Sequence, residues 1–141
     1  MKTIFLIVVF MMMGCSKKSE PLINKDANLS TPVLCMSLNE MMIDKAFIKK
    51  LHALYTFDKN CDLKLSIKYK KDIVCNSPYN ANGKSVSQLP KSFLKLELKR
   101  GLKVVYSYYI DLYDNVDKED IEDAFMRVKK DLIEDSLRNL G

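Results

Sequence analysis

Apolar and polar residues recur along the chain with two different periods, and these periods predict two helices and four strands. Apolar positions three to five residues apart predict a helix over 37–57, where Ser37 and Glu40 also form a capping box. A similar stripe after Asp117, a residue suited to a helix N-cap, predicts a helix at the C-terminal end. The segments between them alternate with a period of two, which is typical of strands.

The alternating segments pair most simply as two hairpins. The first hairpin joins a strand over 62–69 to a short strand over 73–75. The second turns at Lys99-Arg100-Gly101, which places Leu98 opposite Leu102 and Leu96 opposite Val104.

The apolar sides of both helices and one face of the sheet are buried together if the helices lie on the same side of the sheet. The sequence therefore predicts the α+β class. The predicted arrangement is a two-layer sandwich. A four-stranded antiparallel sheet carries two helices on one face, and the elements follow the order α-β-β-β-β-α. We expect this single domain to span 32–141. Residues 15–31 are polar and contain Pro21, so we expect them to form a flexible tether.

The first residues have the pattern of an export signal. Lys2 is followed by an unbroken apolar run from Ile4 to Met13. A spanning helix needs about 20 apolar residues, so this run is too short for a permanent span and matches a signal-peptide core. We predict that residues 1–14 are a signal peptide.

The end of this run, Met12-Met13-Gly14-Cys15, resembles the lipobox of bacterial lipoproteins. The resemblance implies that Cys15 becomes the first mature residue and carries acyl chains, palmitate among them, that anchor the protein in a membrane. Ser16 resembles the pattern of lipoproteins sent to the outer membrane, so we expect an outer-membrane anchor with the domain facing the periplasm. The alternative is an ordinary secretory signal that happens to end near a cysteine.

The composition and charge of the chain exclude several classes of function. The chain has 141 residues, a formal net charge of +5 and 48% hydrophobic residues, which is typical of a globular protein. Basic residues are mixed with acidic ones, so nucleic acid is not an expected partner. His52 is the only histidine and no metal-ligand spacing is present. We therefore predict no catalytic residues, metal or cofactor, and a protein that is not an enzyme.

Three cysteines remain after Cys15, and an exported domain favours one disulfide. A helix over 37–57 would hold Cys35 and Cys61 roughly 30 Å apart, too far for a bridge. Cys35–Cys75 is the preferred pair, because the strand after the helix returns toward Cys35. Cys61–Cys75 ranks second, and three unpaired thiols are the remaining alternative.

Two segments are candidate binding sites. The loop over 76–92 is long for a compact domain and offers Tyr79, Asn82 and Lys84 as contact groups. On the long strand, Val105, Tyr109 and Tyr113 are expected on the sheet face that the helices leave uncovered, where they would form a partner surface. Each segment also has an interpretation without a binding role. The loop over 76–92 would then be simply mobile, and the tyrosines would lie on an open sheet face without a partner.

The expected function is that of a membrane-anchored envelope lipoprotein that acts as a non-enzymatic binding or assembly partner of an outer-membrane or envelope complex. The layout resembles assembly lipoproteins that plug or pilot outer-membrane translocons. The alternative is a surface-exposed, ligand-binding lipoprotein of the adhesin or inhibitor type that uses the 76–92 loop.

The lipobox resemblance generates the first testable prediction. A Cys15→Ala variant has no acylation site, so we expect it to appear in the soluble fraction while the unchanged protein sediments with membranes. Immunoblotting of fractionated cells measures this. A variant that still sediments with the membranes contradicts the anchor.

Overall fold

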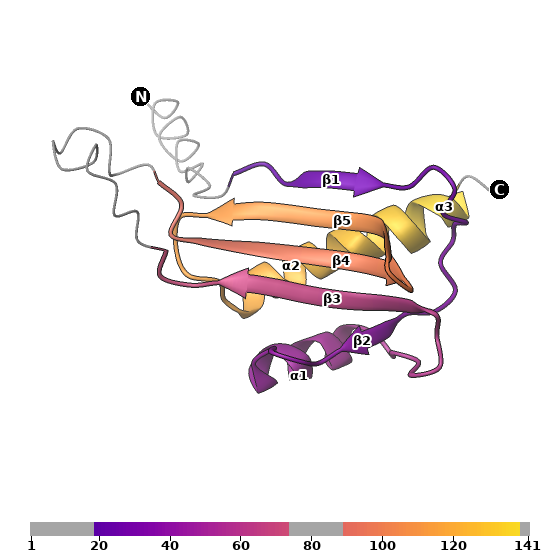
Figure 1. Ribbon diagram of the computed structural model, residues 1–141, viewed down its shortest axis with the longest axis horizontal. Helices are drawn as coiled ribbons and strands as arrows, with labels where there is room; N and C mark the ends of the chain where they lie inside the picture. Colours follow the sequence, from indigo (N-terminus) through magenta and orange to yellow (C-terminus); the bar gives the residue numbers. More distant parts are fainter. Residues whose placement is uncertain (1–18, 74–88, 139–141) are drawn as a thin grey trace, which may run out of the picture.

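The computed structural model describes residues 19–73 and 89–138, which form one five-stranded sheet and the helices packed on it (Figure 1). Neighbouring strands follow the order β1-β5-β4-β3-β2. The strands are β1 (Leu22–Lys25), β2 (Ser37–Asn39), β3 (Leu63–Lys70), β4 (Ser92–Arg100) and β5 (Lys103–Leu112). The helices are α1 (Lys45–Leu54), α2 (Lys118–Lys129), the π-helical turn η4 (Lys130–Glu134) and α3 (Asp135–Arg138).

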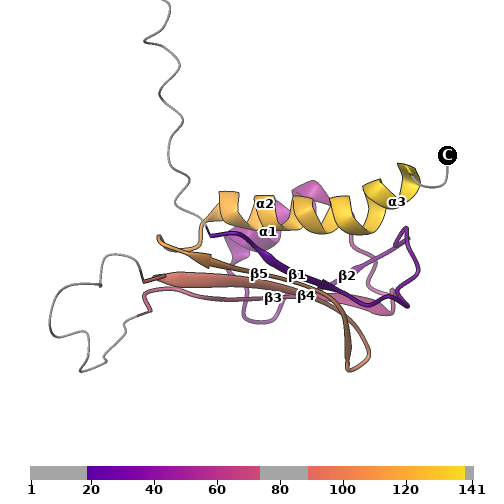
Figure 2. The ribbon, with the colours of Figure 1, turned by 90° about the horizontal axis from the view of Figure 1, so that it is seen from above.

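Helices α1 and α2 pack on the same face of the sheet, and no helix of the described residues lies on the opposite face (Figure 2). The core lies between these layers and includes Leu65, Leu96 and Phe125, none of which is exposed. The α+β class is therefore confirmed. The prediction of four antiparallel strands was wrong, because the sheet has five strands and β2 runs parallel to β3. No helix within the described residues is both long and apolar enough to cross a bilayer.

The predicted helix over 37–57 is divided into a strand, a turn and a shorter helix. Ser37 does not cap a helix, because its hydroxyl donates to the Leu63 carbonyl oxygen (3.2 Å) across the sheet. Met42 has a left-handed φ of 63°, which interrupts any helix that starts near Ser37. Helix α1 begins only after Asp44. Ser37 thus belongs to the sheet edge, and Glu40 pairs with His52 of α1 instead of closing a capping box.

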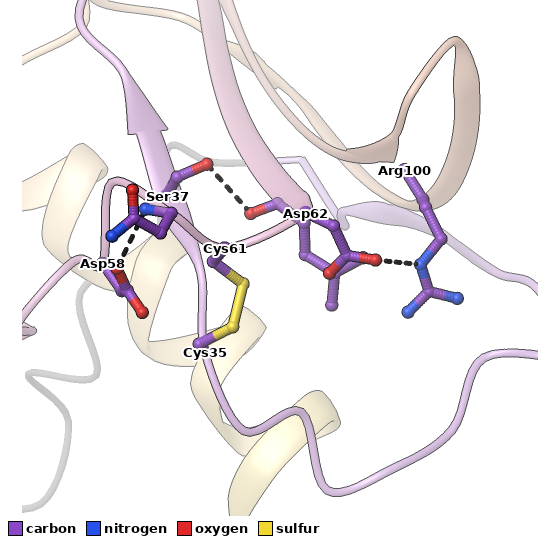
Figure 3. Close-up of a disulfide and its surroundings, with 8 residues drawn as sticks. Cys35, Ser37, Asp58, Cys61, Asp62 and Arg100 are labelled. Carbon is purple, nitrogen blue, oxygen red and sulfur yellow. Dashed lines mark hydrogen bonds and ion pairs between the residues drawn. A yellow bond between two sulfur atoms is a disulfide. The ribbon is translucent and has the colours of Figure 1, made fainter.

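Strand β2, helix α1 and strand β3 form a crossover that brings Cys35 and Cys61 together (Figure 3). Ser37 lies opposite Lys64 in the parallel register, so the residues just before each strand are neighbours. The two cysteines form a disulfide with their Cα atoms 5.9 Å apart. The preferred pair Cys35–Cys75 was therefore wrong. The error came from treating 37–57 as one helix, which keeps its two ends apart, whereas a parallel crossover returns them to the same end.

The β4–β5 hairpin is confirmed, but its predicted register was wrong. Leu98 lies opposite Tyr106 rather than Leu102, and the turn consists of Gly101 and Leu102. Gly101 has a φ of 59°, which a two-residue turn of type II′ requires at its first position. A bulge between Leu98 and Lys99 completes the shift. Tyr106 and Tyr108 are buried, whereas Leu102 is fully exposed and Val104 is 41% exposed instead of facing the core.

The predicted hairpin between 62–69 and 73–75 is also replaced by a longer pairing. Strand β3 pairs with β4 along its whole length, from Leu63 opposite Arg100 to Lys70 opposite Phe93. Ile73 is not in a strand, although its backbone N–H donates to the Lys91 carbonyl oxygen at 2.8 Å. Eight consecutive pairs with β4 bury more apolar surface than a three-residue partner could.

Part of the expected tether is a strand. Residues Leu22–Lys25 form β1 and pair antiparallel with β5, with Leu22 opposite Tyr109. The Ser19 hydroxyl also donates to the Asp111 carbonyl oxygen at 2.8 Å. The segment from Ser19 to Lys25 therefore runs along the edge of the sheet.

The helix start predicted at Asp117 is confirmed. The Asp117 carboxylate accepts a hydrogen bond from the Asp120 N–H (2.9 Å), and the Asp120 carboxylate accepts one from the Asp117 N–H (3.0 Å). Beyond the other end of this helix, Asp131 of η4 accepts a hydrogen bond of 2.7 Å from the Tyr106 hydroxyl of β5. Helix α2 is thus fixed at both ends.

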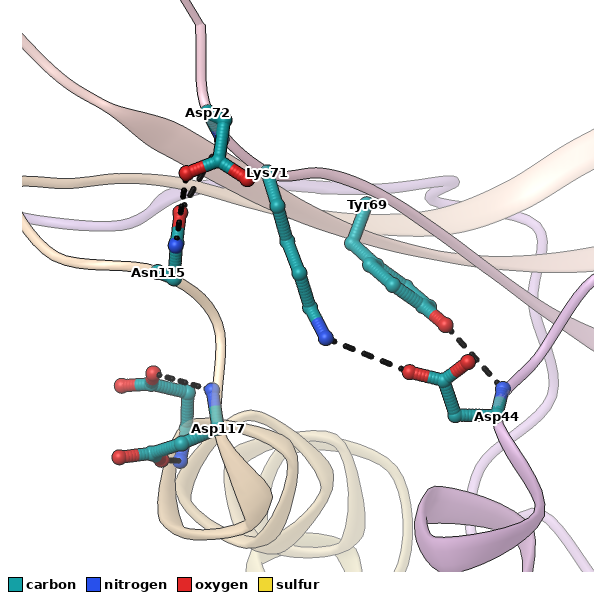
Figure 4. A network of polar contacts seen from close by, with 7 residues as sticks. Asp44, Tyr69, Lys71, Asp72, Asn115 and Asp117 are labelled. Carbon is teal, nitrogen blue, oxygen red and sulfur yellow. Dashed lines mark hydrogen bonds and ion pairs between the residues drawn. The ribbon is translucent and has the colours of Figure 1, made fainter.

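Polar contacts hold α1 and the loop before α2 to the end of β3 (Figure 4). The Asp44 N–H donates to the Tyr69 hydroxyl at 3.1 Å, and Lys71 Nζ pairs with the Asp44 carboxylate at 3.3 Å. Asp72 and Asn115 form two mutual hydrogen bonds of 2.9 and 3.0 Å. The contacts fix the positions of both helix starts on the same face.

The disulfide generates a stability prediction. It closes a segment of 26 residues, for which the chain-entropy model gives about 3 to 4 kcal/mol. We expect the Cys35→Ala/Cys61→Ala double variant to lose about that much free energy of unfolding, measured by urea denaturation.

The unchanged protein in reductant is the control and should match the double variant. Peptide mapping of the unreduced protein should yield a Cys35–Cys61 peptide. A Cys35–Cys75 peptide would contradict the crossover.

Candidate functional site

The face of the sheet opposite α1 and α2, called here the open face, is the candidate site. Side chains alternate along a strand, so every second residue of β3, β4 and β5 points away from the helices. Leu94, Leu96 and Leu98 of β4 are wholly buried on the helix side. The open face carries the residues between them and their cross-strand partners: Lys64, Ser66, Lys68, Lys70, Phe93, Lys95, Glu97, Lys99, Ser107, Tyr109 and Asp111.

A basic cluster, consisting of Lys68, Lys95, Glu97 and Lys99, occupies the middle of this face. Lys95 Nζ lies 2.6 Å from Glu97 Oε1, and Lys99 Nζ lies 3.3 Å from Oε2. Lys68 Nζ is farther from Oε2, at 3.8 Å. Glu97 is only 7% exposed, although none of the described helices covers this face. Long lysine stems can cover a carboxylate in this way.

The strand register explains why a carboxylate is needed there. Lys68 lies directly opposite Lys95, and Lys64 lies directly opposite Lys99. Like charges directly opposite one another destabilise a sheet. Glu97 lies between these two pairs on β4, where its charge offsets the repulsion.

Burial and the lysines act on Glu97 in opposite directions. Burial raises the pKa of the Glu97 carboxyl, but the adjacent Lys95 and Lys99 ammonium groups outweigh burial and leave this pKa below its ordinary value. Glu97 is therefore ionised at neutral pH. Its Oε2 atom is buried and accepts no well-aligned hydrogen bond from the described residues, although Lys99 Nζ lies 3.3 Å away.

The basic cluster continues into a groove beside the end of β2. The groove has a volume of about 490 Å³ and is lined by Lys68, Lys99 and Tyr69 together with Met41 and Met42. The two methionines are 76% and 95% exposed. Methionine is a flexible, polarisable side chain that suits adaptable binding surfaces. The groove therefore combines positive charge with accessible apolar surface.

An aromatic patch, formed by Leu22, Phe93 and Tyr109, occupies one end of the open face. The Phe93 and Tyr109 rings stack with their centroids 5.8 Å apart. The Tyr109 hydroxyl donates to the Asp111 carboxylate at 2.7 Å, and this hydrogen bond raises the pKa of Tyr109. Leu22 lies opposite Tyr109 and is 70% exposed.

The residues predicted for a partner surface do not all lie together. Tyr109 faces the open side, and Tyr113, just after β5, is 37% exposed. Val105 is buried at 4% exposure, because the bulge in the hairpin places two consecutive residues, Val105 and Tyr106, in the core. Tyr79, Asn82, Lys84, Cys75 and Cys15 lie outside the described residues.

Sequence reasoning missed the basic cluster. The alternation of β4 already placed Phe93, Lys95, Glu97 and Lys99 on one face, but the predicted register set Glu97 against Lys103. In the structure Lys103 instead forms an ion pair with Asp26 of the segment after β1, and this pair lowers the pKa of Asp26. The cluster emerges only when β3 is known to pair with β4.

The remaining histidine, cysteine and carboxylate side chains of the described residues form no second cluster. His52 Nε2 lies 2.9 Å from Glu40 Oε1 in an exposed pair. Two of the cysteines are joined in the disulfide. Within residues 19–73 and 89–138, no group of three or more His, Cys, Asp or Glu side chains could hold a metal ion.

Compared with protein-family models, with curated proteins and with solved structures, the chain matches none of them.

The basic cluster generates a pH-dependent prediction. Because the folded-state pKa of Glu97 is lowered, the charged form stabilises the protein above about pH 4, and this contribution is lost as pH falls through the folded-state pKa. We expect Glu97→Gln to lower the free energy of unfolding at pH 7 by about 1 to 2 kcal/mol. The deficit should shrink at lower pH, measured by urea denaturation at pH 7 and pH 3.

Glu40→Gln is the matched control, because Glu40 is exposed and exposed ion pairs contribute little. A deficit for Glu97→Gln that is the same at both pH values would show that ionisation of Glu97 does not stabilise the sheet.

Proposed function

We propose that the chain is a lipid-anchored, non-enzymatic protein of a bacterial envelope, attached to the outer membrane on its periplasmic side. We further propose that it binds an acidic segment of another envelope protein through the basic cluster and the adjoining groove. The export signal and the lipobox-like ending at Cys15 support the location. Binding is supported by one observation, the concentration of lysines on a sheet face that no described helix covers.

The chemistry of the open face determines the kind of partner. Four lysines, at positions 64, 68, 95 and 99, surround a single carboxylate, so the face attracts negative charge. Electrostatic complementarity of this kind guides association and selects partners. The exposed methionines of the groove add apolar surface, which favours a partner segment that mixes acidic and apolar side chains.

A matched pair of photo-crosslinking variants tests this proposal. A photoreactive amino acid in place of Met41 lies in the groove, whereas one in place of Lys49 lies on the exposed side of α1. After irradiation of intact cells, we expect the Met41 variant to form a discrete crosslinked protein and the Lys49 variant to form none. Mass spectrometry of the crosslinked peptide then shows whether the contacting segment is acidic.

Charge reversal tests the electrostatic part. Lys64→Glu/Lys68→Glu places two negative charges on exposed positions of the open face, and we expect it to reduce the Met41 crosslink at least tenfold. Lys45→Glu/Lys49→Glu makes the same change on α1 and should leave the yield unchanged. Equal crosslinking from both faces, or an unchanged yield after reversal on β3, would refute the basic cluster as the binding site.

A further inference from the structure

The N-terminal segment is held at one end of the sheet. Strand β1 pairs with β5, and Ser19, the first described residue, bonds to the Asp111 carbonyl oxygen near the end of β5. The aromatic patch lies at this same end, because Leu22 and Phe93 lie opposite Tyr109 and Asp111. The start of the described chain lies beside the end of β5 (Figure 1) and is therefore close to the aromatic patch.

The chain between this point and Cys15 is short. Three residues, 16–18, separate Cys15 from Ser19, so their Cα atoms are four steps along the chain and at most about 14 Å apart even when this segment is fully extended. A lipid-anchored Cys15 lies at the membrane surface, so the end of the sheet that carries Ser19 cannot move far from that surface.

We infer that the aromatic patch lies against the phospholipid headgroups beside the lipid anchor, so that the sheet meets the membrane by this end. The inference rests on the proposed lipid anchor and adds the orientation of the domain and a second contact with lipid. Burying the exposed side chain of Leu22 and the stacked rings in the interfacial region adds to the membrane affinity that the acyl chains supply.

The side chains at this end suit the headgroup region. Tyrosine is enriched where a bilayer meets water, because its ring is apolar and its hydroxyl is polar. Tyr113 and Leu89, 37% and 38% exposed, are the large apolar side chains that follow β5 and precede β4. Asp111 and Asp114 lie at the same end as Lys70, which is opposite Phe93, so this end carries charges of both signs and does not select anionic lipid. The occupant is therefore the zwitterionic headgroup interface.

The opposite end of the sheet provides an internal control. The turn at Gly101 and Leu102 lies at the other end of β5, nine residues from Leu112, or about 30 Å along the strand. Leu102 is fully exposed. On the inferred orientation, Leu102 points away from the membrane that holds the anchor.

Single tryptophans test this orientation, because the chain contains no tryptophan of its own. Leu22→Trp and Leu102→Trp are made separately in the full chain, and the acylated proteins are reconstituted into phosphatidylcholine vesicles with bromine on the upper acyl carbons. We expect Leu22→Trp to lose most of its fluorescence relative to unbrominated vesicles and Leu102→Trp to lose none. Tyr113→Trp repeats the test at the same end on an independent, exposed position.

Flotation of the same vesicles separates the two proposals. Protein that floats and is quenched only at positions 22 and 113 supports the inferred orientation. Protein that floats but shows no quenching there, or equal quenching at position 102, overturns the orientation and leaves the anchor intact. Protein that does not float refutes the lipid anchor, and the inference fails with it.

Discussion

Burial of a single face of the sheet is the constraint on which the rest of this structure depends. Helices α1 and α2 cover one side, so each long strand must divide its residues between an apolar core and solvent. Strand β4 shows the division most clearly, with three wholly buried leucines alternating with Phe93, Lys95, Glu97 and Lys99. The polar chemistry of the open face follows from this division, because a charged residue on the other side would have to enter the core.

This constraint also explains which parts of the fold could be predicted from the sequence. Strong alternation identified β3, β4 and β5 as strands, and the acidic start of α2 was recognisable because Asp117 and Asp120 have a local role. The α+β class and the shared side of the helices followed from the same patterns.

The errors arose where a short element carries no period of its own. Three residues of β2 and four of β1 are too few to show alternation. Reading β2 as the first turn of a helix then misplaced the ends of that helix and with them the disulfide. The predicted register of the β4–β5 hairpin was wrong for a different reason, because a bulge breaks the strict alternation that the prediction assumed. In the candidate site too, local patterns were recognised and long-range pairing was missed. Tyr109 was found from its own strand, whereas the basic cluster depends on the pairing of β3 with β4.

The pairing of β1 with β5 connects the two proposals made for this protein. Without β1, residues 15–31 would form a loose tether, and the domain could turn freely beneath its anchor. With β1 in place, the proposed anchor at Cys15 would be held near the end of the strands, while the basic cluster lies about halfway along them. A domain attached by one end keeps the middle of its open face clear of the membrane, so a protein partner can approach from the side. Weakening the β1–β5 pairing would therefore loosen the orientation of the domain even if the lipid anchor and the basic cluster were both unchanged.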